Sequence, residues 1–307
     1  SANIRPATKA RVEEAIQELG YRPNTAARAL VTRRSGIIGV VGSNSGLYGP
    51  ASIQRSVLEA ARTAGYFSSL VPLAEVTVEE LHSALDHLVR QSVEAIVMIV
   101  GKEDALAVVH ATSAGVPLIV VEGDLSGRGL TVGVDQIEGA RQATQHLLDL
   151  GHRAIDHVAG PLTYTEAKGR RIGYEETMRS AGLAARELWE GDWTPQSGYR
   201  IGRELVQRAR STAVFVANDQ MSIGVMHAFA EAGVRVPEDI SVVGFDDIPE
   251  SGYLNPALTT VRQDFRVLGQ RAIDLVTKTL EGAPSSVPLL VPELIIRAST
   301  APPQEAP

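Results

Sequence analysis

From Gly36 onward the chain alternates short apolar runs with longer segments of helical pattern, and this alternation restricts its possible folds most strongly. The runs are rich in valine and isoleucine and read IIGVV, FSSLV, AIVMIV, PLIVV, LTVGV, AIDHVA, AVFVA and ISVVGF. Such runs are typical of strands buried on both faces of a parallel sheet. Several intervening segments end at glycine, a common helix stop: Ala51–Ala64, Gln136–Leu150 and Gln220–Ala232. This regular alternation predicts an α/β protein with right-handed crossovers.

The series of runs is too long for one small open sheet, so we predict two successive doubly wound parallel sheets. A chain of 307 residues is also long enough for two cores. Thr77 with Glu80 has the spacing of a capping box, and Thr194 precedes a proline suited to the first position of a helix. Residues 301–307 are proline-rich and have no apolar face, which predicts a disordered tail.

The first 35 residues differ in charge from the rest of the chain. They carry seven basic and three acidic side chains, a charge of +4, whereas the remainder carries 22 basic and 33 acidic side chains, a charge of −11. A basic arm on an acidic body is typical of contact with a polyanion, although a solvated surface helix would show the same charge. Thr8–Leu19 is patterned as an amphipathic helix, and Thr25–Val31, capped by Asn24, as a shorter one. Both need partners for stability, so we expect this chain to begin inside a small helical domain.

Other features argue against several classes of protein. No apolar run approaches the roughly 18 residues of a membrane span, and the first residues lack the apolar core of a secretory signal, so we expect a cytoplasmic protein with no membrane partner. Cysteine is absent, which excludes disulfides and cysteine metal sites. The histidines show no metal-ligand spacing, and the glycine motifs of nucleotide-binding loops are missing. We therefore expect no metal and no cofactor.

Polar side chains follow several of the predicted strands. Ligands of open α/β sheets bind beyond the carboxyl ends of the strands, so these side chains predict one shared cleft. Glu122 and Asp246-Asp247 could form a catalytic carboxylate pair, as in glycoside hydrolysis, or accept hydrogen bonds from ligand hydroxyls, or cap turns. Because no histidine or third acid stands at a defined spacing, we expect no catalytic residues. Trp193 and Phe265 could be core aromatics or could stack on a sugar ring.

Five segments of the sequence resemble the LacI/GalR family of bacterial transcription regulators: ELGYRPNTAARAL, AGPL followed by GRRIGY, VANDQM, PEDISVVGFDD and NPALTTVRQDFRVLG. The resemblance covers essentially all of residues 3–300. It implies two doubly wound parallel-sheet subdomains, like those of type I periplasmic binding proteins, preceded by a partial helix-turn-helix and a hinge helix. The implied domains are 1–35 for the DNA-binding remnant, 36–134 with 266–293 for the N-terminal subdomain, and 135–265 with 294–300 for the C-terminal subdomain.

The resemblance implies that operator DNA is the partner of the basic arm. In this family the hinge helices of a dimer enter the minor groove, where an apolar wedge unstacks a base step and kinks the duplex. Leu30 would be the wedge here, and the positions around it that would contact DNA are Asn24, Ala27 and Arg28. The first two helices of the helix-turn-helix have no counterpart, so this chain should lack most base-specific readout.

The resemblance also implies a small carbohydrate effector bound between the subdomains. Its polar contacts would be Ser43, Glu122, Arg170, Asn218, Asp246 and Gln263, and its apolar walls Leu47, Pro50, Ile53, Trp193 and Phe265. Carboxylates with an arginine suit a neutral polyol, because each hydroxyl both donates and accepts. Glu122, Tyr164 and Glu166 leave the identity of the sugar open.

The family resemblance favours a repressor that releases DNA when the sugar binds. Residues 288–307 contain no leucine repeat for tetramers, so we expect a homodimer. A sugar-binding transport protein with the same core is the alternative. The missing signal sequence and the basic arm argue against it.

Overall fold

The computed structural model describes residues 5–18, 34–44, 46–74, 76–112, 114–122, 130–186, 188–208, 211–283 and 287–304. The first element is helix α1 (Pro6–Glu18), which covers most of the helix predicted at Thr8–Leu19. Val12, on the predicted apolar face, is 53% exposed. The described part of the chain therefore does not bury this side chain, in keeping with a helix that needs a partner.

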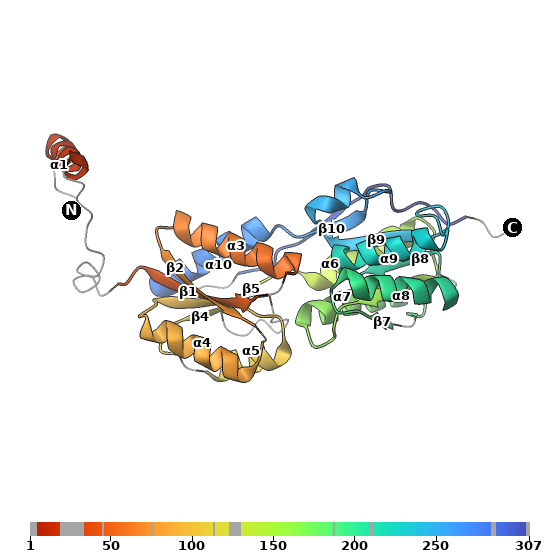
Figure 1. Ribbon diagram of the computed structural model, residues 1–307, viewed down its shortest axis with the longest axis horizontal. Helices are drawn as coiled ribbons and strands as arrows, with labels where there is room; N and C mark the ends of the chain where they lie inside the picture. The colour runs from red at the N-terminus through yellow and green to blue at the C-terminus, as the bar shows by residue number, and fades with distance from the viewer. Residues whose placement is uncertain are drawn as a thin grey trace.

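The first lobe is built on a five-stranded sheet in the order β2-β1-β3-β4-β5, with all neighbouring strands parallel. Its strands are β1 (Ile37–Ser43), β2 (Phe67–Leu73), β3 (Ala95–Ile99), β4 (Leu118–Val121) and β5 (Leu130–Val132). Its helices are α3 (Tyr48–Thr63), α4 (Val78–Arg90), α5 (Glu103–Ala111) and α10 (Phe265–Leu280). Helices α3 and α10 cover one face of the sheet and α4 and α5 the other (Figure 1). The sheet is doubly wound, as predicted.

The second lobe is built on a six-stranded sheet in the order β11-β10-β9-β8-β6-β7. Its strands are β6 (Ile155–Ala159), β7 (Leu188–Glu190), β8 (Ala213–Val216), β9 (Ser241–Asp246), β10 (Thr259–Arg262) and β11 (Glu293–Ile295). Its helices are α6 (Gln136–Asp149), α7 (Thr165–Ser180), α8 (Pro195–Arg208) and α9 (Asp219–Glu231). Helices α6 and α7 pack on one face and α8 and α9 on the other. Strand β11 pairs antiparallel with β10, whereas the other pairs are parallel.

Several helices begin where the sequence combines apolar spacing with a side-chain cap, and α4 and α8 are examples. In α4 the buried residues Leu81, Ala84, Leu85 and Leu88 recur on one face, and the Thr77 hydroxyl accepts a 3.2 Å hydrogen bond from the amide of Glu80. Thr194 caps α8 in the same way, through a 3.2 Å bond to a main-chain amide of its first turn. Both caps confirm the sequence predictions.

Within the described ranges, three connections run from one lobe to the other. They join β5 to α6, β10 to α10, and α10 to β11. The first and last of these connections pair with each other, because the amide of Asp135 donates to the carbonyl of Leu290 at 2.8 Å. Phe265, which the predicted boundaries place in the second subdomain, instead packs in the core of the first lobe. The reason is that Asp264 caps α10, so the helix and its apolar face begin at Phe265 itself.

The prediction of a disordered tail over 301–307 is wrong for residues 301–304, and residues 305–307 lie outside the described ranges. The amide of Ala301 donates to the Ser241 hydroxyl at 3.0 Å, and its carbonyl lies 2.9 Å from Nε2 of His152. These main-chain bonds order the segment without any apolar face. Composition alone could not reveal them, because the partners lie far away in the sequence.

Candidate effector site

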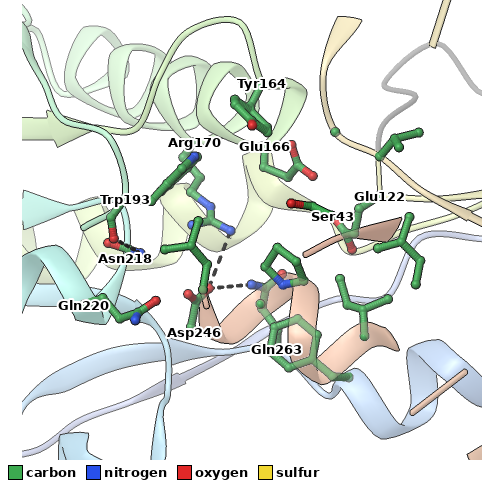
Figure 2. Close-up of a pocket in the computed structure, with 18 of the residues that line it drawn as sticks. Ser43, Glu122, Tyr164, Glu166, Arg170, Trp193, Asn218, Gln220, Asp246 and Gln263 are labelled. Atoms are coloured by element: carbon green, nitrogen blue, oxygen red, sulfur yellow. Dashed lines mark hydrogen bonds and ion pairs between the residues drawn. The ribbon is translucent and has the colours of Figure 1, made fainter. Parts of the chain in front are cut away.

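A cavity of about 840 Å³, which includes space open to solvent, lies between the lobes at the carboxyl ends of strands from both sheets. The structure brings together all eleven of the predicted effector residues around it: Ser43, Leu47, Pro50, Ile53, Glu122, Arg170, Trp193, Asn218, Asp246, Gln263 and Phe265. Figure 2 shows Arg170, Asn218 and Asp246 on one side of this cavity and Ser43 and Glu122 on the other. A doubly wound fold places strand ends in this way, because parallel strands end at one edge of their sheet.

Eight further lining residues were not among the predicted site residues: Gly49, Val76, Ile99, Val100, Gly101, Tyr164, Glu166 and Gln220. The sequence held a signal for some of them. Gln220 follows Asn218 at the start of α9, and Gly101 directly follows a predicted strand. Tyr164 is the N-cap residue of α7, and Glu166 lies in its first turn, one turn before Arg170.

The apolar side of the cavity comes from the N-terminal end of α3 and from α10. Leu47, Pro50 and Ile53 line it with Phe265, whose ring centroid lies 5.9 Å from that of Tyr48 in an edge-to-face contact. Trp193 faces them from the second lobe and contacts Gly160 so closely that a Cβ there would clash with the indole. The two aromatic side chains therefore line the cavity from opposite lobes.

The Arg170 guanidinium organises the polar side of the cavity. Its Nε donates to Oε1 of Gln136 at 2.8 Å, its Nη1 donates to the carbonyl of Ala217, and its Nη2 lies 3.7 Å from Oδ1 of Asp246. The guanidinium carbon lies 3.8 Å from the centroid of the Phe245 ring, a cation–π contact. These contacts fix the orientation of the guanidinium, whose Nη2 is directed toward the Asp246 carboxylate.

Hydrogen bonds continue from Arg170 through Gln136 into both lobes. The Gln136 amide nitrogen donates to Oε2 of Glu122 at 3.0 Å and to Oε1 of Gln263 at 2.9 Å. Gln263 in turn donates to Oδ1 of Asp246 at 2.7 Å. Asn218 orients Trp193 by donating to its carbonyl at 3.1 Å. Five buried side chains of the site thus form one connected network whose members orient one another: Glu122, Gln136, Arg170, Asp246 and Gln263.

Burial raises the pKa of the carboxyl groups in and behind the site. The pKa of Glu122 rises to about 8, chiefly through burial and then through the negative charge of Glu166. Burial also raises the pKa of Asp246 to about 6, although Arg170 opposes the rise. Behind Asp246, burial raises the pKa of Asp219 to about 7. Burial therefore disfavours the ionised forms of these three carboxyl groups.

Three residues of the cavity wall have backbone angles in the left-handed region. The φ angle is 56° for Glu122, 72° for Trp193 and 108° for Asp246. Such angles cost side-chain-bearing residues on the order of 1–3 kcal/mol each, and they persist only where surrounding contacts hold them. Their position here indicates that the fold holds the side chains in place before a ligand arrives.

Contacts between the lobes border the cavity. The amide of Tyr48 donates to Oε1 of Gln220 at 3.1 Å, and the amide of Thr165 donates to the carbonyl of Gly101 at 2.9 Å. Lys168 adds an ion pair to Glu103 at 2.6 Å. The lobes therefore touch on the same side as the ligand-binding residues, where a bound molecule would alter their contacts.

The residues predicted to contact DNA do not lie in the part of the chain that the structure describes. They are Asn24, Ala27, Arg28 and Leu30. Within the described ranges, no helix is long and apolar enough to cross a membrane. In the same ranges, no three acidic or histidine side chains gather in a group that could hold a metal ion.

Residues 144–300 match the family of periplasmic binding protein-like domains. Over 304 residues the chain is 33% identical to the lactose operon repressor of Escherichia coli (strain K12), covering 98% of this chain and 84% of that protein. Its fold is similar to that of the lac repressor dimer bound to operator and the anti-inducer ONPF, with a TM-score of 0.85, 32% identity, and coverage of 92% of this chain and 99% of that one.

A complex of the transcriptional regulator CelR with cellobiose is also similar. Its TM-score is 0.78 at 31% identity, and the match covers 97% of this chain and 92% of that one. These relatives are named as a repressor or as a transcriptional regulator, and the sequence and structural matches both extend over nearly the whole chain. The chain therefore belongs to the LacI/GalR family of transcription regulators.

Proposed function

We propose that this protein is a dimeric repressor whose affinity for operator DNA is controlled by a small carbohydrate bound between the lobes. The observation that carries the proposal is the two-sided cavity. A polar arc that includes Arg170, Asn218 and Asp246 faces apolar side chains such as Leu47 and Phe265. A sugar ring has the same two kinds of surface, hydroxyls around its edge and C–H groups on its faces.

Each side chain has a distinct role in this proposal. Arg170 donates to ring oxygens, while Asp246 accepts from hydroxyls, and together they bind groups that both donate and accept. Trp193 and Phe265 close over the apolar faces of the ring. The network through Gln136 and Gln263 holds the Glu122 and Asp246 carboxylates in fixed positions. Ligand binding therefore costs little side-chain entropy.

Control of DNA binding follows from the position of the cavity. A ligand that contacts both lobes stabilises one relative arrangement of them, and it shifts the protein only by the difference in its affinity for the two arrangements. Such coupling typically amounts to about 1–3 kcal/mol. In the dimer this change would alter whether the two hinge segments meet on DNA, with Leu30 as wedge and Asn24, Ala27 and Arg28 beside it.

The remaining predictions belong to the same proposal. The lobes serve as the two effector subdomains, with the boundaries predicted above but with Phe265 moved to the first. The protein works in the cytoplasm, where its operator is, and has no enzymatic activity. The relatives are named as repressors and transcriptional regulators, so the transport-protein alternative is not adopted.

Calorimetry with cellobiose, lactose, glucose and galactose tests the site. The Arg170→Ala variant should bind any sugar that the parent binds at least about tenfold more weakly, a loss of about 1.4 kcal/mol. Arg171→Ala is the matched control, because Arg171 is the next residue of α7 and instead pairs with Glu175 at 2.6 Å. Equal affinities of Arg170→Ala and the parent would refute the site assignment. Arg170→Lys, which keeps the charge, separates a binding defect from misfolding.

A further inference from the structure

The described residues that line the cavity carry more negative than positive charge. Glu122, Glu166 and Asp246 contribute carboxyl groups, whereas Arg170 contributes a guanidinium. The segment 123–129, which follows Glu122 in the sequence, contains one aspartate and one arginine and so adds no net charge. When all groups are ionised, the wall holds an excess of negative charge that this arginine does not balance.

The Glu166 carboxylate is poorly satisfied within the described protein. It accepts a long 3.3 Å hydrogen bond from the hydroxyl of Thr165 and a contact from its own main-chain amide. Asp219, a carboxylate without access to the cavity, provides the contrast. It accepts from the amide of Ile248 at 2.9 Å and from the hydroxyls of Ser251 and Thr260 at 2.6 Å each. Glu166 therefore retains acceptor capacity that the described residues do not use.

Glu166 and Glu122 face the same space from opposite lobes. Glu166 stands in the first turn of α7 in the second lobe, and Glu122 follows β4 in the first. Figure 2 shows the Glu166 carboxylate pointing toward the side of the cavity that carries Ser43 and Glu122. It lies so close to Gly101 of the first lobe that a Cβ there would clash with it. Bringing the lobes together therefore brings two carboxyl groups together.

We propose that the effector is a hydroxylated ring that carries a protonated amine, and that this ammonium group binds between Glu122 and Glu166. The inference rests on the proposed function and narrows its ligand class. An ammonium group has three donors and no acceptor, which matches carboxylates, whereas a neutral hydroxyl would leave the charge excess in place. The ring hydroxyls remain with Arg170, Asn218 and Asp246, as proposed above.

The arrangement gives the amine a role in control. An ammonium bound to both carboxylates attracts one lobe to the other, whereas without it Glu122 keeps its proton at pH 7 and supplies no such attraction. Burial and then the charge of Glu166 raise the pKa of Glu122 to about 8. Among the described residues, Arg170 favours the ionised form of both groups, and Asp246 opposes ionisation of Glu166.

The test compares matched compounds on the whole chain by calorimetry. The panel is glucose and galactose, their derivatives with an amino group at carbon 2, 3, 4 or 6, the N-acetyl form of each amine, and 1-deoxynojirimycin, whose ring nitrogen is basic. We expect at least one amine to bind about tenfold or more tightly than its neutral and N-acetyl counterparts. In Glu166→Gln the preference should fall below about threefold, whereas Glu59→Gln, which removes an exposed charge from α3, should retain it.

A second measurement is the number of protons released on binding, which would not change if the amine were preferred for its shape alone. An ammonium bound at pH 7 should release a proton from Glu122, detectable as a binding enthalpy that changes with the ionisation enthalpy of the buffer. Glu122→Gln should abolish this release. The inference is overturned if the neutral sugars bind as tightly as the amines, if the preference survives Glu166→Gln, or if no amine binds. In the first case the carbohydrate function stands, and the Arg170→Ala comparison decides that function separately.

Discussion

Glu122, which follows the last strand residue of β4 in the first lobe, accepts a 3.0 Å hydrogen bond from Gln136, the first residue of α6 in the second lobe. The same amide nitrogen donates to Gln263, and the Gln136 oxygen accepts from Arg170. One buried side chain thereby joins the carboxylate of one lobe to the arginine of the other. A ligand that displaces the Glu122 carboxylate will therefore change the hydrogen bonding of Arg170 through the Gln136 amide.

The first prediction concerns Gln136 itself. Gln136→Ala should lower the free energy of unfolding by about 1–3 kcal/mol, because Oε2 of Glu122, Oε1 of Gln263 and Nε of Arg170 each lose a hydrogen-bond partner in a buried place. Urea unfolding measures the loss. Gln145→Ala on the same helix should cost less than about 0.5 kcal/mol, since Gln145 is exposed and bonds Asp149 of its own helix. Equal losses in the two variants would mean that the network adds no stability.

The second prediction concerns pH. Glu122 has a pKa raised to about 8 in the folded protein, above its value in the unfolded chain, so the folded state binds more protons between about pH 4.5 and 8. Stability from this group is therefore present at low pH and is lost as the pH rises through that window. Burial lowers the pKa of His157 to about 4, which acts in the opposite direction between about pH 4 and 6.5.

A comparison of variants isolates the contribution of Glu122. Urea midpoints of the parent and of Glu122→Gln should diverge between pH 5 and pH 8, with the parent losing about 1–3 kcal/mol more than the variant. His157 cancels in this difference, because both proteins contain it. Parallel pH profiles would show that Glu122 ionises normally in the folded protein.

The third prediction uses the two tryptophans of the chain. Trp193 lines the cavity, whereas Trp189 lies on strand β7 and is not among its lining residues. In Trp189→Phe the fluorescence should still change when an effector binds, and in Trp193→Phe the change should vanish. A response that follows Trp189 instead would place the ligand elsewhere.

The fourth prediction concerns DNA. In a form of the protein that carries a complete helix-turn-helix, Leu30→Ala should weaken binding to a palindrome with a central CpG step by about tenfold or more, because the wedge that offsets unstacking is lost. Gel shifts measure the effect. Val206→Ala is the matched control, as it shortens an exposed aliphatic side chain of α8 in the second lobe. If Leu30→Ala bound as tightly as the parent, Leu30 would not be the wedge.

The sequence predicted the alternating fold because runs such as Ile37–Val41 and Ala95–Val100 are apolar on both faces, which few other structures allow. Polar side chains after several strands predicted a shared cleft, because ligands of open α/β sheets bind there, and the family resemblance implied the apolar wall. Gln136 was missed as a site residue because its role depends on partners from three distant segments. The ordered tail at Ala301 was missed because main-chain bonds leave no mark on composition.

The returning path of α10 has a consequence for synthesis on the ribosome. The core of the first lobe includes Leu268, Ile273 and Val276, which leave the ribosome only after most of the second lobe has been made. Until then the face of the first sheet that α10 will cover carries α3 without its main helical neighbour. Nascent chains ordinarily fold their N-terminal units first. Here the nascent first lobe exposes an apolar surface while more than a hundred residues of the second lobe are made. We expect chaperones to cover this surface until α10 emerges.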